Sequence, residues 1–342
     1  MPRWQVMRVV AAPDKLRGSA SAPEVAAAVA RAAGAAGWRC DEVPMADGGE
    51  GTLDAFGGPN RTTVVTGPLG APVEAAWRLH GRTAVIEMAR AAGLDLVGGA
   101  DGNDPVAAST VGVGELVVTA LDAGATRVIV GVGGSATTDG GLAALRALHP
   151  LSRLKGVERL VACDVRTAFV DAAEVFAPQK GATPAQVELL RRRLDRLAQV
   201  YRSEHDVDVT ALEGAGAAGG LAGGLAAAGA RLMSGFELIA DEVELYDRIE
   251  GADLVVTGEG FLDAQSFEGK VVGGVAALAA EAGVPVVAVA GQVFDDAGDR
   301  IEAISLVERF GEARAMTDTV ACIEEVVGAL LAGRSAAPGG RR

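Results

Sequence analysis

Cysteine and histidine are scarce in this sequence of 342 residues, which argues against several kinds of site. Its three cysteines, Cys40, Cys163 and Cys322, are odd in number and lack a Cys-x-x-Cys spacing, so neither a disulfide framework nor a zinc knuckle is indicated. The three histidines form no His-Glu-x-x-His motif, which leaves histidine-based metal or nucleophile chemistry with little support. A chain of this kind suits a reducing compartment, and a cytoplasmic location is expected.

Positive charge and long apolar runs are also in short supply. The 31 Lys and Arg against 45 Asp and Glu give a formal net charge of −14, a sign that nucleic-acid phosphates and anionic membranes repel. The longest uncharged run, 214–230, is glycine and alanine with only two leucines, too weakly apolar to span a membrane. We therefore expect a small-molecule substrate and neither a nucleic-acid nor a membrane partner; a homodimer is compatible with the sequence.

Short apolar runs that alternate with helix-forming stretches are abundant at both ends of the chain. A strand at 8–12 is followed by a helix that Ser21 and Glu24 open as a capping box, and by a strand at 41–46. The same order returns near the carboxyl end, with strands at 253–257, 285–290 and 303–307 and helices around 271–282 and 319–331. This alternation predicts a parallel sheet covered by helices on both faces.

The middle of the chain has a different pattern. Strands at 62–66, 73–80 and 83–88 joined by short Gly/Pro turns are typical of a meander, and a helix over 184–201 begins with a Thr183/Gln186 capping box. We predict an α/β protein of two α/β domains. Residues 1–61 and 240–342 form a Rossmann- or flavodoxin-like parallel-sheet domain, interrupted by an inserted mixed α/β domain of residues 62–239.

Polar residues follow the predicted strands where the parallel sheet would bind a ligand, at its carboxyl edge. These residues are Asp14, Lys15, Arg17, Asp47, Gly48, Gly49, Glu50, Glu259 and Asp263. Glycine lets the backbone approach a ligand, carboxylates can hold Mg²⁺, and Lys or Arg can meet phosphate oxygens, a combination that suits phosphoryl transfer. Any one of these loops could instead be an ordinary turn with a helix-capping Asp; several on one edge favour a site.

The inserted region contributes a loop, 131–141, rich in glycine and hydroxyl groups, between a strand at 127–130 and a helix. Such a loop at a helix N-terminus predicts an anion site, with Gly133, Gly134, Ser135, Thr137 and Asp139 as the candidate cofactor-binding residues. Its first residues also match the GxGxxA pattern, which keeps a nucleotide-binding oxidoreductase as an alternative, although the acid expected about 20 residues further on is missing.

A P-loop is not present. Lys270 follows Gly269, but the earlier glycine of the P-loop motif is absent and Val271 stands where the motif requires Ser or Thr. A Walker-type ATPase is therefore excluded, and Lys270 stays a candidate phosphate ligand on its own.

Five segments taken together resemble the bacterial type I glycerate kinase family: 12–19, 44–52, 131–141, 176–183 and 257–266. The resemblance implies a two-domain α/β enzyme whose active site lies in the interdomain cleft. It implies transfer of the γ-phosphate of ATP to D-glycerate, usually giving 2-phosphoglycerate, with Mg²⁺. The chain departs from the family's usual pattern at 107–110 and 166–169, which leaves a kinase for another short hydroxy acid, or a non-catalytic nucleotide- or metabolite-binding protein of the same fold, as alternatives.

Phosphoryl transfer needs alignment, charge neutralisation and a carboxylate that receives the acceptor proton. Asp47, Lys15, Arg17 and Glu50 are the candidate catalytic residues, with Asp47 the first choice for the base. Lys270 joins the phosphate-binding loop as a cofactor residue, and Asp47, Glu50 and Asp139 are candidate metal ligands. Further candidate site residues are Asp14, Gly48, Gly49, Lys180, Glu259, Asp263 and Gln265.

Overall fold

The computed structural model describes residues 6–294 and 297–336. The chain forms two compact units: residues 1–47 with 236–342 make unit 1, and residues 48–235 make unit 2. The first boundary lies at Asp47, earlier than the 61/62 boundary expected from the pattern, because the turn after Gly48 is hydrogen-bonded to Glu87 of unit 2. The second lies at Gly235, close to the expected 239/240.

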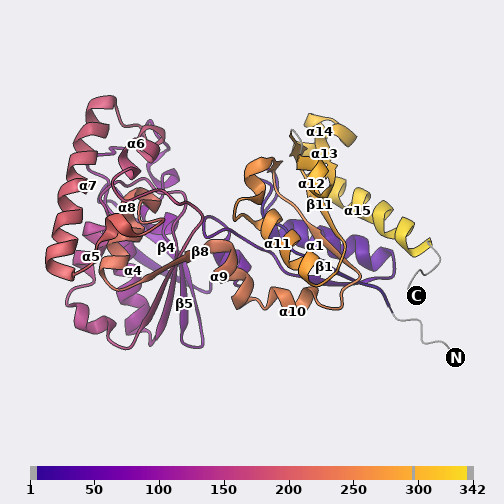
Figure 1. The fold of residues 1–342 in the computed structure, drawn as a ribbon, viewed down its shortest axis with the longest axis horizontal. Helices are drawn as coiled ribbons and strands as arrows, with labels where there is room; N and C mark the ends of the chain where they lie inside the picture. Colours follow the sequence, from indigo (N-terminus) through magenta and orange to yellow (C-terminus); the bar gives the residue numbers. More distant parts are fainter. Residues whose placement is uncertain (1–5, 295–296, 337–342) are drawn as a thin grey trace. The chain divides into compact units, whose positions relative to one another are not determined.

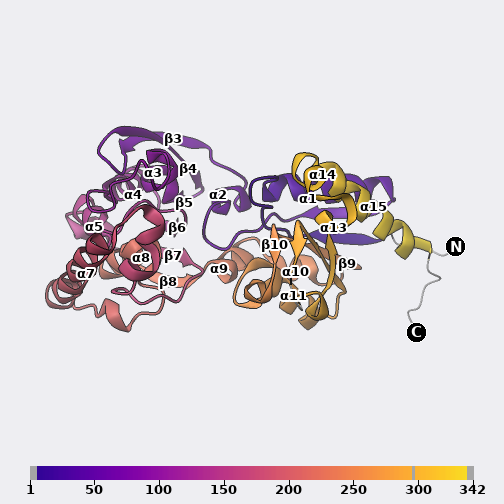
Figure 2. The ribbon, with the colours of Figure 1, turned by 90° about the horizontal axis from the view of Figure 1, so that it is seen from above.

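Unit 1 contains a sheet of five strands, all parallel, in the order β13-β11-β9-β1-β2. The strands are β1 (Arg8–Ala11), β2 (Arg39–Glu42), β9 (Leu254–Thr257), β11 (Val286–Ala290) and β13 (Glu302–Ser305). Helices α1 (Ala22–Ala35) and α15 (Thr319–Ala336) pack together against one face, and α11 (Val271–Glu281), beside α10 (Leu245–Ile249), covers the other (Figures 1 and 2). The predicted parallel sheet with helices on both faces is confirmed.

Short elements complete unit 1 around the carboxyl edge of its sheet. Strands β10 (Phe261–Leu262) and β12 (Gln292–Val293) pair in parallel, and the 3-10 turn η5 (Ala264–Phe267) follows β10. The helices α12 (Ala297–Arg300), α13 (Leu306–Phe310) and α14 (Glu312–Thr317) lie on either side of β13 in sequence. The predicted strand 303–307 was wrong at its end, because the Ser305 hydroxyl accepts the Glu308 N–H and starts α13.

Unit 2 contains a sheet of six strands in the order β3-β4-β5-β6-β7-β8. These strands are β3 (Arg61–Thr66), β4 (Pro72–His80), β5 (Thr83–Glu87), β6 (Arg127–Gly131), β7 (Glu158–Cys163) and β8 (Arg231–Ser234). The first three are antiparallel, as the meander pattern predicted, and the pairs from β5 to β8 are parallel. The glycine-rich loop therefore leaves the carboxyl end of a central parallel strand, β6.

The core of unit 2 lies between the sheet and a layer of helices. Its helices are α2 (Thr52–Ala55), α3 (Ala89–Ala92), α4 (Val111–Asp122), α5 (Leu142–Ala147), α6 (Ala172–Phe176), α7 (Pro184–His205) and α8 (Ala217–Ala227), and α9 (Gly235–Glu242) starts at its last residue. Figure 1 shows α5, α6, α7 and α8 grouped on one side of this sheet. The capping box predicted at Thr183 is present at the start of α7. Within the described parts of the chain, no helix is both long and apolar enough to cross a membrane.

Candidate active-site residues in each unit

The loops that follow β1, β2 and β9 meet at the carboxyl edge of the unit 1 sheet. The Asp14 N–H donates to the Gly258 carbonyl at 2.8 Å, and the Met45 N–H donates to the Pro13 carbonyl at 2.9 Å. Gly258 is required there, because a Cβ on it would lie 2.1 Å from the Val289 carbonyl oxygen of β11. Backbone bonds thus fix the positions from which Asp14, Asp47 and Glu259 extend.

These carboxylates influence one another electrostatically. Burial raises the pKa of Asp14 to about 7, Asp47 and Glu259 add to the rise, and Lys15, whose Nζ lies 3.9 Å from Asp14 Oδ1, opposes it. Burial also raises the pKa of Glu259, while Lys270 lowers it. The structure therefore brings Asp14, Lys15, Asp47 and Glu259 into one charged group, with Lys270 close enough to act on it.

The donors in this group fit a Mg²⁺ ion that arrives with a nucleotide. Among the described residues, no set of three or more His, Cys, Asp or Glu side chains is arranged to hold a metal on its own. Nucleotide-bound Mg²⁺ needs only one or two carboxylates besides phosphate oxygens and water. Glu259 Oε1 is buried without a hydrogen-bond partner, next to the charges of Asp14 and Asp47, and such an orphaned acceptor suits a cation.

The other candidates of unit 1 have more varied surroundings. The Asp263 carboxylate accepts the N–H groups of Gln265 and Ser266 and so caps η5. This is the helix-capping role that the sequence left open for an Asp in such a loop. Arg17 and Gln265 are exposed. Lys270 is the N-cap residue of α11 and makes no side-chain capping bond.

In unit 2 the glycine-rich loop and the turn that begins at Gly48 touch through their backbones. A Cβ on Gly133 would lie 2.6 Å from the Gly49 Cα, and one on Gly131 would lie 2.7 Å from the Gly48 carbonyl oxygen. Distances below 3.0 Å leave no space for a side chain at either glycine. Glu50, at the end of this turn, is exposed, whereas Gly48 is buried.

Lys180 supports the glycine-rich loop from inside unit 2. Its side chain is buried, and its Nζ donates to Ser135 Oγ and to the Thr137 carbonyl, both at 2.7 Å. Burial lowers the pKa of Lys180 to about 7, while the nearby Asp139 opposes this shift. Ser135 and Thr137 are themselves buried, so the loop exposes its backbone, chiefly at Gly134.

Asp139 is engaged by protein donors. Its carboxylate accepts the Thr110 N–H at 2.9 Å, the Thr110 hydroxyl at 2.8 Å and the Gly141 N–H at 3.0 Å. Burial raises its pKa and these donors lower it. Protein donors thus occupy the Asp139 carboxylate, which makes it a poorer metal ligand than the sequence pattern indicates.

The GxGxxA alternative loses its structural basis. In a dinucleotide fold the last position of that pattern packs within the helix that follows the strand. Here α5 begins only at Leu142, after the pattern has ended at Ala136. The loop instead runs alongside α3, with the Leu94 N–H bonded to the Gly134 carbonyl and the Ala136 N–H bonded to the Ala92 carbonyl, each at 2.9 Å.

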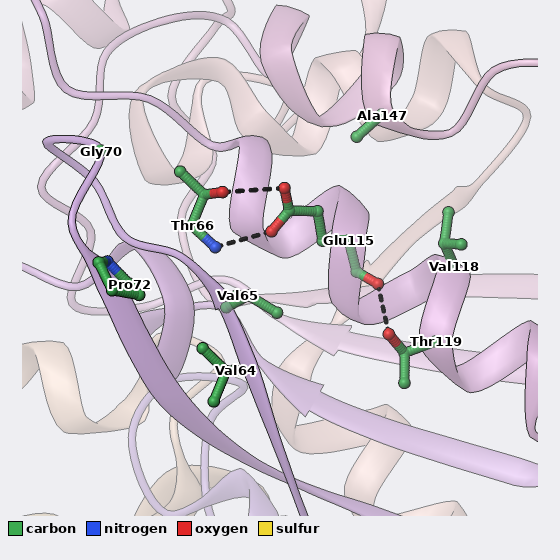
Figure 3. Close-up of a pocket in the computed structure, with 9 residues that line it drawn as sticks. All are labelled: Val64, Val65, Thr66, Gly70, Pro72, Glu115, Val118, Thr119 and Ala147. Carbon is green, nitrogen blue, oxygen red and sulfur yellow. Dashed lines mark hydrogen bonds between the residues drawn. The ribbon is translucent and has the colours of Figure 1, made fainter.

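A pocket of about 560 Å³ in unit 2 lies away from all of these residues. It is bordered by β3, the start of β4 and α4 (Figure 3). Its carboxylate, Glu115, accepts the Thr66 N–H at 2.7 Å and the Thr66 hydroxyl at 2.9 Å, so its polar groups satisfy one another. Size alone does not make this pocket a reaction site.

Two features of unit 2 are not predicted from the sequence. Glu87, at the end of β5, is buried and binds the turn after Glu50, although a single carboxylate after an apolar run gives no local signal. The weakly apolar run 214–230 packs against the glycine-rich loop, since a Cβ on Gly219 would lie 2.0 Å from the Thr137 carbonyl oxygen. Its repeated glycines were the available signal, since Gly219, Gly220 and the adjoining Ala218 have left-handed backbone.

A parallel α/β sheet with half-buried carboxylates and a lysine at its carboxyl edge suits a phosphoryl-transferring enzyme, a kinase. Comparison with known proteins agrees. The model of the glycerate kinase family matches residues 9–151 and 149–331, so the chain belongs to the glycerate kinase family.

Individual relatives are similar along most of their length. Glycerate 2-kinase of Escherichia coli K12 is 40% identical, over 85% of this chain and 87% of that protein. Glycerate kinase of Bacillus subtilis 168 is 39% identical, over 85% and 86%. A crystal structure of a protein assigned as glycerate kinase 2 in Salmonella typhimurium LT2 has a TM-score of 0.80 and 35% identity, over 97% of this chain and all of that one.

Proposed function

We propose that this kinase transfers the γ-phosphate of ATP to a hydroxyl group of D-glycerate and releases 2-phosphoglycerate. The observation that carries the proposal is the charged group of Asp14, Lys15, Asp47 and Glu259 at the sheet edge, in a chain of the glycerate kinase family. Carboxylates and a lysine that backbone hydrogen bonds hold close together meet the needs of a reaction that depends on alignment and charge.

Asp47 receives the proton of the acceptor hydroxyl in this proposal. It is half-buried and lies within the electrostatic reach of Asp14 and Glu259. Lys15 and Arg17, which follow the same strand as Asp14, offer positive charge to the glycerate carboxylate or to the phosphoryl group in transfer. Glu50, exposed on the turn after Asp47, orients the acceptor with its own carboxylate.

Backbone N–H groups of the loop at Gly133 and Gly134 bind the phosphates of ATP. Lys180 beneath this loop contributes positive charge without occupying its surface, because its Nζ is already bonded to Ser135 and Thr137. Lys270 is a further phosphate ligand. Bound Mg²⁺ would neutralise phosphate charge, and Asp14 and Glu259 are the residues that would hold it, Glu259 through its unpartnered oxygen.

The proposal is tested by ATP consumption. Purified protein is given ATP and Mg²⁺ with D-glycerate, with L-glycerate, with lactate, with glycolate or with no acceptor. The expected result is turnover with D-glycerate well above every other mixture. Preferred turnover of another hydroxy acid would overturn the acceptor assignment, and binding of ATP without turnover of any acceptor would show a binding protein.

The cysteines bear on the compartment in which the protein works. Cys40, Cys163 and Cys322 are all free thiols. Free thiols persist in a reducing compartment, and we propose the cytoplasm as the location.

A further inference from the structure

Glu87 is a buried carboxylate to which no part of the proposed reaction assigns a role. It is the last residue of β5, and its side chain is only 2% exposed. A buried carboxylate is costly unless protein donors satisfy it. Its partners therefore show what it holds in place.

Both oxygens of Glu87 are used. Oε1 accepts the N–H of Gly51 at 3.0 Å and the N–H of Leu53 at 2.9 Å. Oε2 accepts the Arg90 Nε–H at 3.0 Å, and the Arg90 side chain is 46% exposed. Oε1 thus binds only backbone N–H groups, and Oε2 binds a cation at the surface.

The backbone that Glu87 binds is the N-terminus of α2. Gly51 is the N-cap residue of this helix, has a φ of +97°, and has no side chain with which to cap it. First-turn N–H groups of a helix need an acceptor. Glu87 supplies that acceptor from a strand far away in the sequence.

The same turn carries residues of the proposed reaction. Glu50 immediately precedes Gly51, and Gly49 is the residue whose Cα would lie 2.6 Å from a Cβ on Gly133. Met88, the neighbour of Glu87, donates its N–H to the Gly131 carbonyl at 3.0 Å. One end of β5 thus holds both the turn 48–51 and the start of the glycine-rich loop.

We propose that Glu87 is a positioning residue of the phosphoryl transfer: its carboxylate sets the turn 48–51, with Glu50, in register with the glycine-rich loop. The inference rests on the proposed function. Glu87 touches no reactant and acts through the N–H groups of Gly51 and Leu53. Its removal leaves two buried N–H groups without an acceptor, so the turn has to shift toward water.

Three variants separate positioning from bulk stability. E87M keeps the length of the side chain and removes both acceptors. E87Q keeps one carbonyl oxygen for the two N–H groups and removes the charge. R90M is the matched control, because it removes only the surface partner of Oε2. For each protein, kcat, KM for both substrates, the melting temperature and amide hydrogen exchange at Gly51 and Leu53 are measured.

We expect E87M to lower kcat by about 10- to 100-fold, since a displacement of about 1 Å can cost about 10²-fold in rate. Exchange at Gly51 and Leu53 should accelerate, E87Q should recover most of the rate and protection, and R90M should match wild type. If E87M does not fold, E87Q carries the test, with a smaller loss of kcat that tracks faster exchange at these two amides.

Wild-type kcat in E87M or E87Q with accelerated exchange at both amides would overturn the inference, as would an equal loss in R90M. The inclusion of wild type separates the two hypotheses. An inactive wild-type protein contradicts the proposed function, whereas an active wild type beside a fully active E87 variant contradicts only the role of Glu87.

Discussion

Burial, more than pairing, sets the chemistry of the charged residues in this protein. It raises the pKa of Asp14 to about 7 and lowers that of Lys180 to about 7, against opposing charges in each case. Residues with such shifts concentrate at functional sites because the protein bears the cost of their desolvation. The sequence motifs placed both residues among the candidates, yet burial depends on tertiary packing, and no local pattern could have predicted either shift.

Asp47→Asn tests the assignment of the base. We expect kcat to fall by about 10²- to 10³-fold, the usual cost of one group that stabilises or deprotonates the reacting atoms. The melting temperature should stay unchanged. Asp318→Asn is the matched control, because Asp318 is exposed and is not a candidate site residue. Steady-state kinetics at saturating ATP and D-glycerate give the answer, and a D47N enzyme as fast as D318N would remove Asp47 from the mechanism.

Asp14 gives the stability of the protein a pH dependence with a definite sign. Its pKa is raised from 3.8 to about 7 on folding, so the folded state favours the protonated acid. The stability that protonation confers is full below about pH 4 and is lost as the pH rises through about 7. Without Mg²⁺ or nucleotide, wild type should lose up to about 4 kcal/mol relative to D14N over this range.

Denaturant unfolding of wild type and D14N at a series of pH values measures this difference. The free energy of unfolding of wild type should fall relative to that of D14N as the pH rises. Added Mg²⁺ with ATP should make this fall smaller. Parallel pH profiles of the two proteins would show that Asp14 ionises as freely in the folded state as in the unfolded chain.

At the scale of elements, close backbone contact makes glycine a structural requirement. The loop 131–141, the turn 48–51 and the run 214–230 meet through glycines, with no side chain between the backbones. Short continuous apolar runs that alternate with helical stretches predicted the parallel sheet of unit 1, because strands buried on both faces are apolar throughout. Strands joined by short Gly/Pro turns predicted the meander of unit 2. The strand expected at 41–46 was misplaced, because the structure puts β2 at Arg39–Glu42. The segment after β2 bonds to the chain after β1 by single contacts, from the Val43 N–H to the Ala11 carbonyl and from the Met45 N–H to the Pro13 carbonyl.

Gly133→Ala should separate the glycine-rich loop from the turn 48–51. The added Cβ lies 2.6 Å from the Gly49 Cα, so backbone has to move. We expect a loss of about 10- to 100-fold in kcat/KM for ATP, with a loss of about 1–3 kcal/mol in stability.

Gly34→Ala is the control for a glycine substitution as such. Gly34 is exposed in α1, and nothing lies within 4 Å of its added Cβ. This variant should keep full activity and gain about 0.5–1 kcal/mol of stability. Equal behaviour of G133A and G34A in both measurements would contradict the close packing of loop and turn.

At the scale of the whole molecule, the net charge of −14 does not oppose the proposed binding of an anionic nucleotide, because that binding depends on local cations. Screening over a Debye length of about 8 Å makes distant acidic residues unimportant. The two-unit organisation was foreseeable from the change of pattern along the chain. The position of the first boundary was not, because Glu87 ties the segment after Gly48 to unit 2 through contacts distant in sequence.

The most direct measurement is a ³¹P NMR spectrum of the complete reaction, taken after the protein has consumed a known amount of ATP with Mg²⁺ and D-glycerate. We expect ADP and 2-phosphoglycerate in equal amounts, and no signal of a sugar-acid phosphate when D-glycerate is left out. A phosphate on the 3-hydroxyl group would contradict the assigned product, and inorganic phosphate as the sole product would contradict phosphoryl transfer to D-glycerate itself.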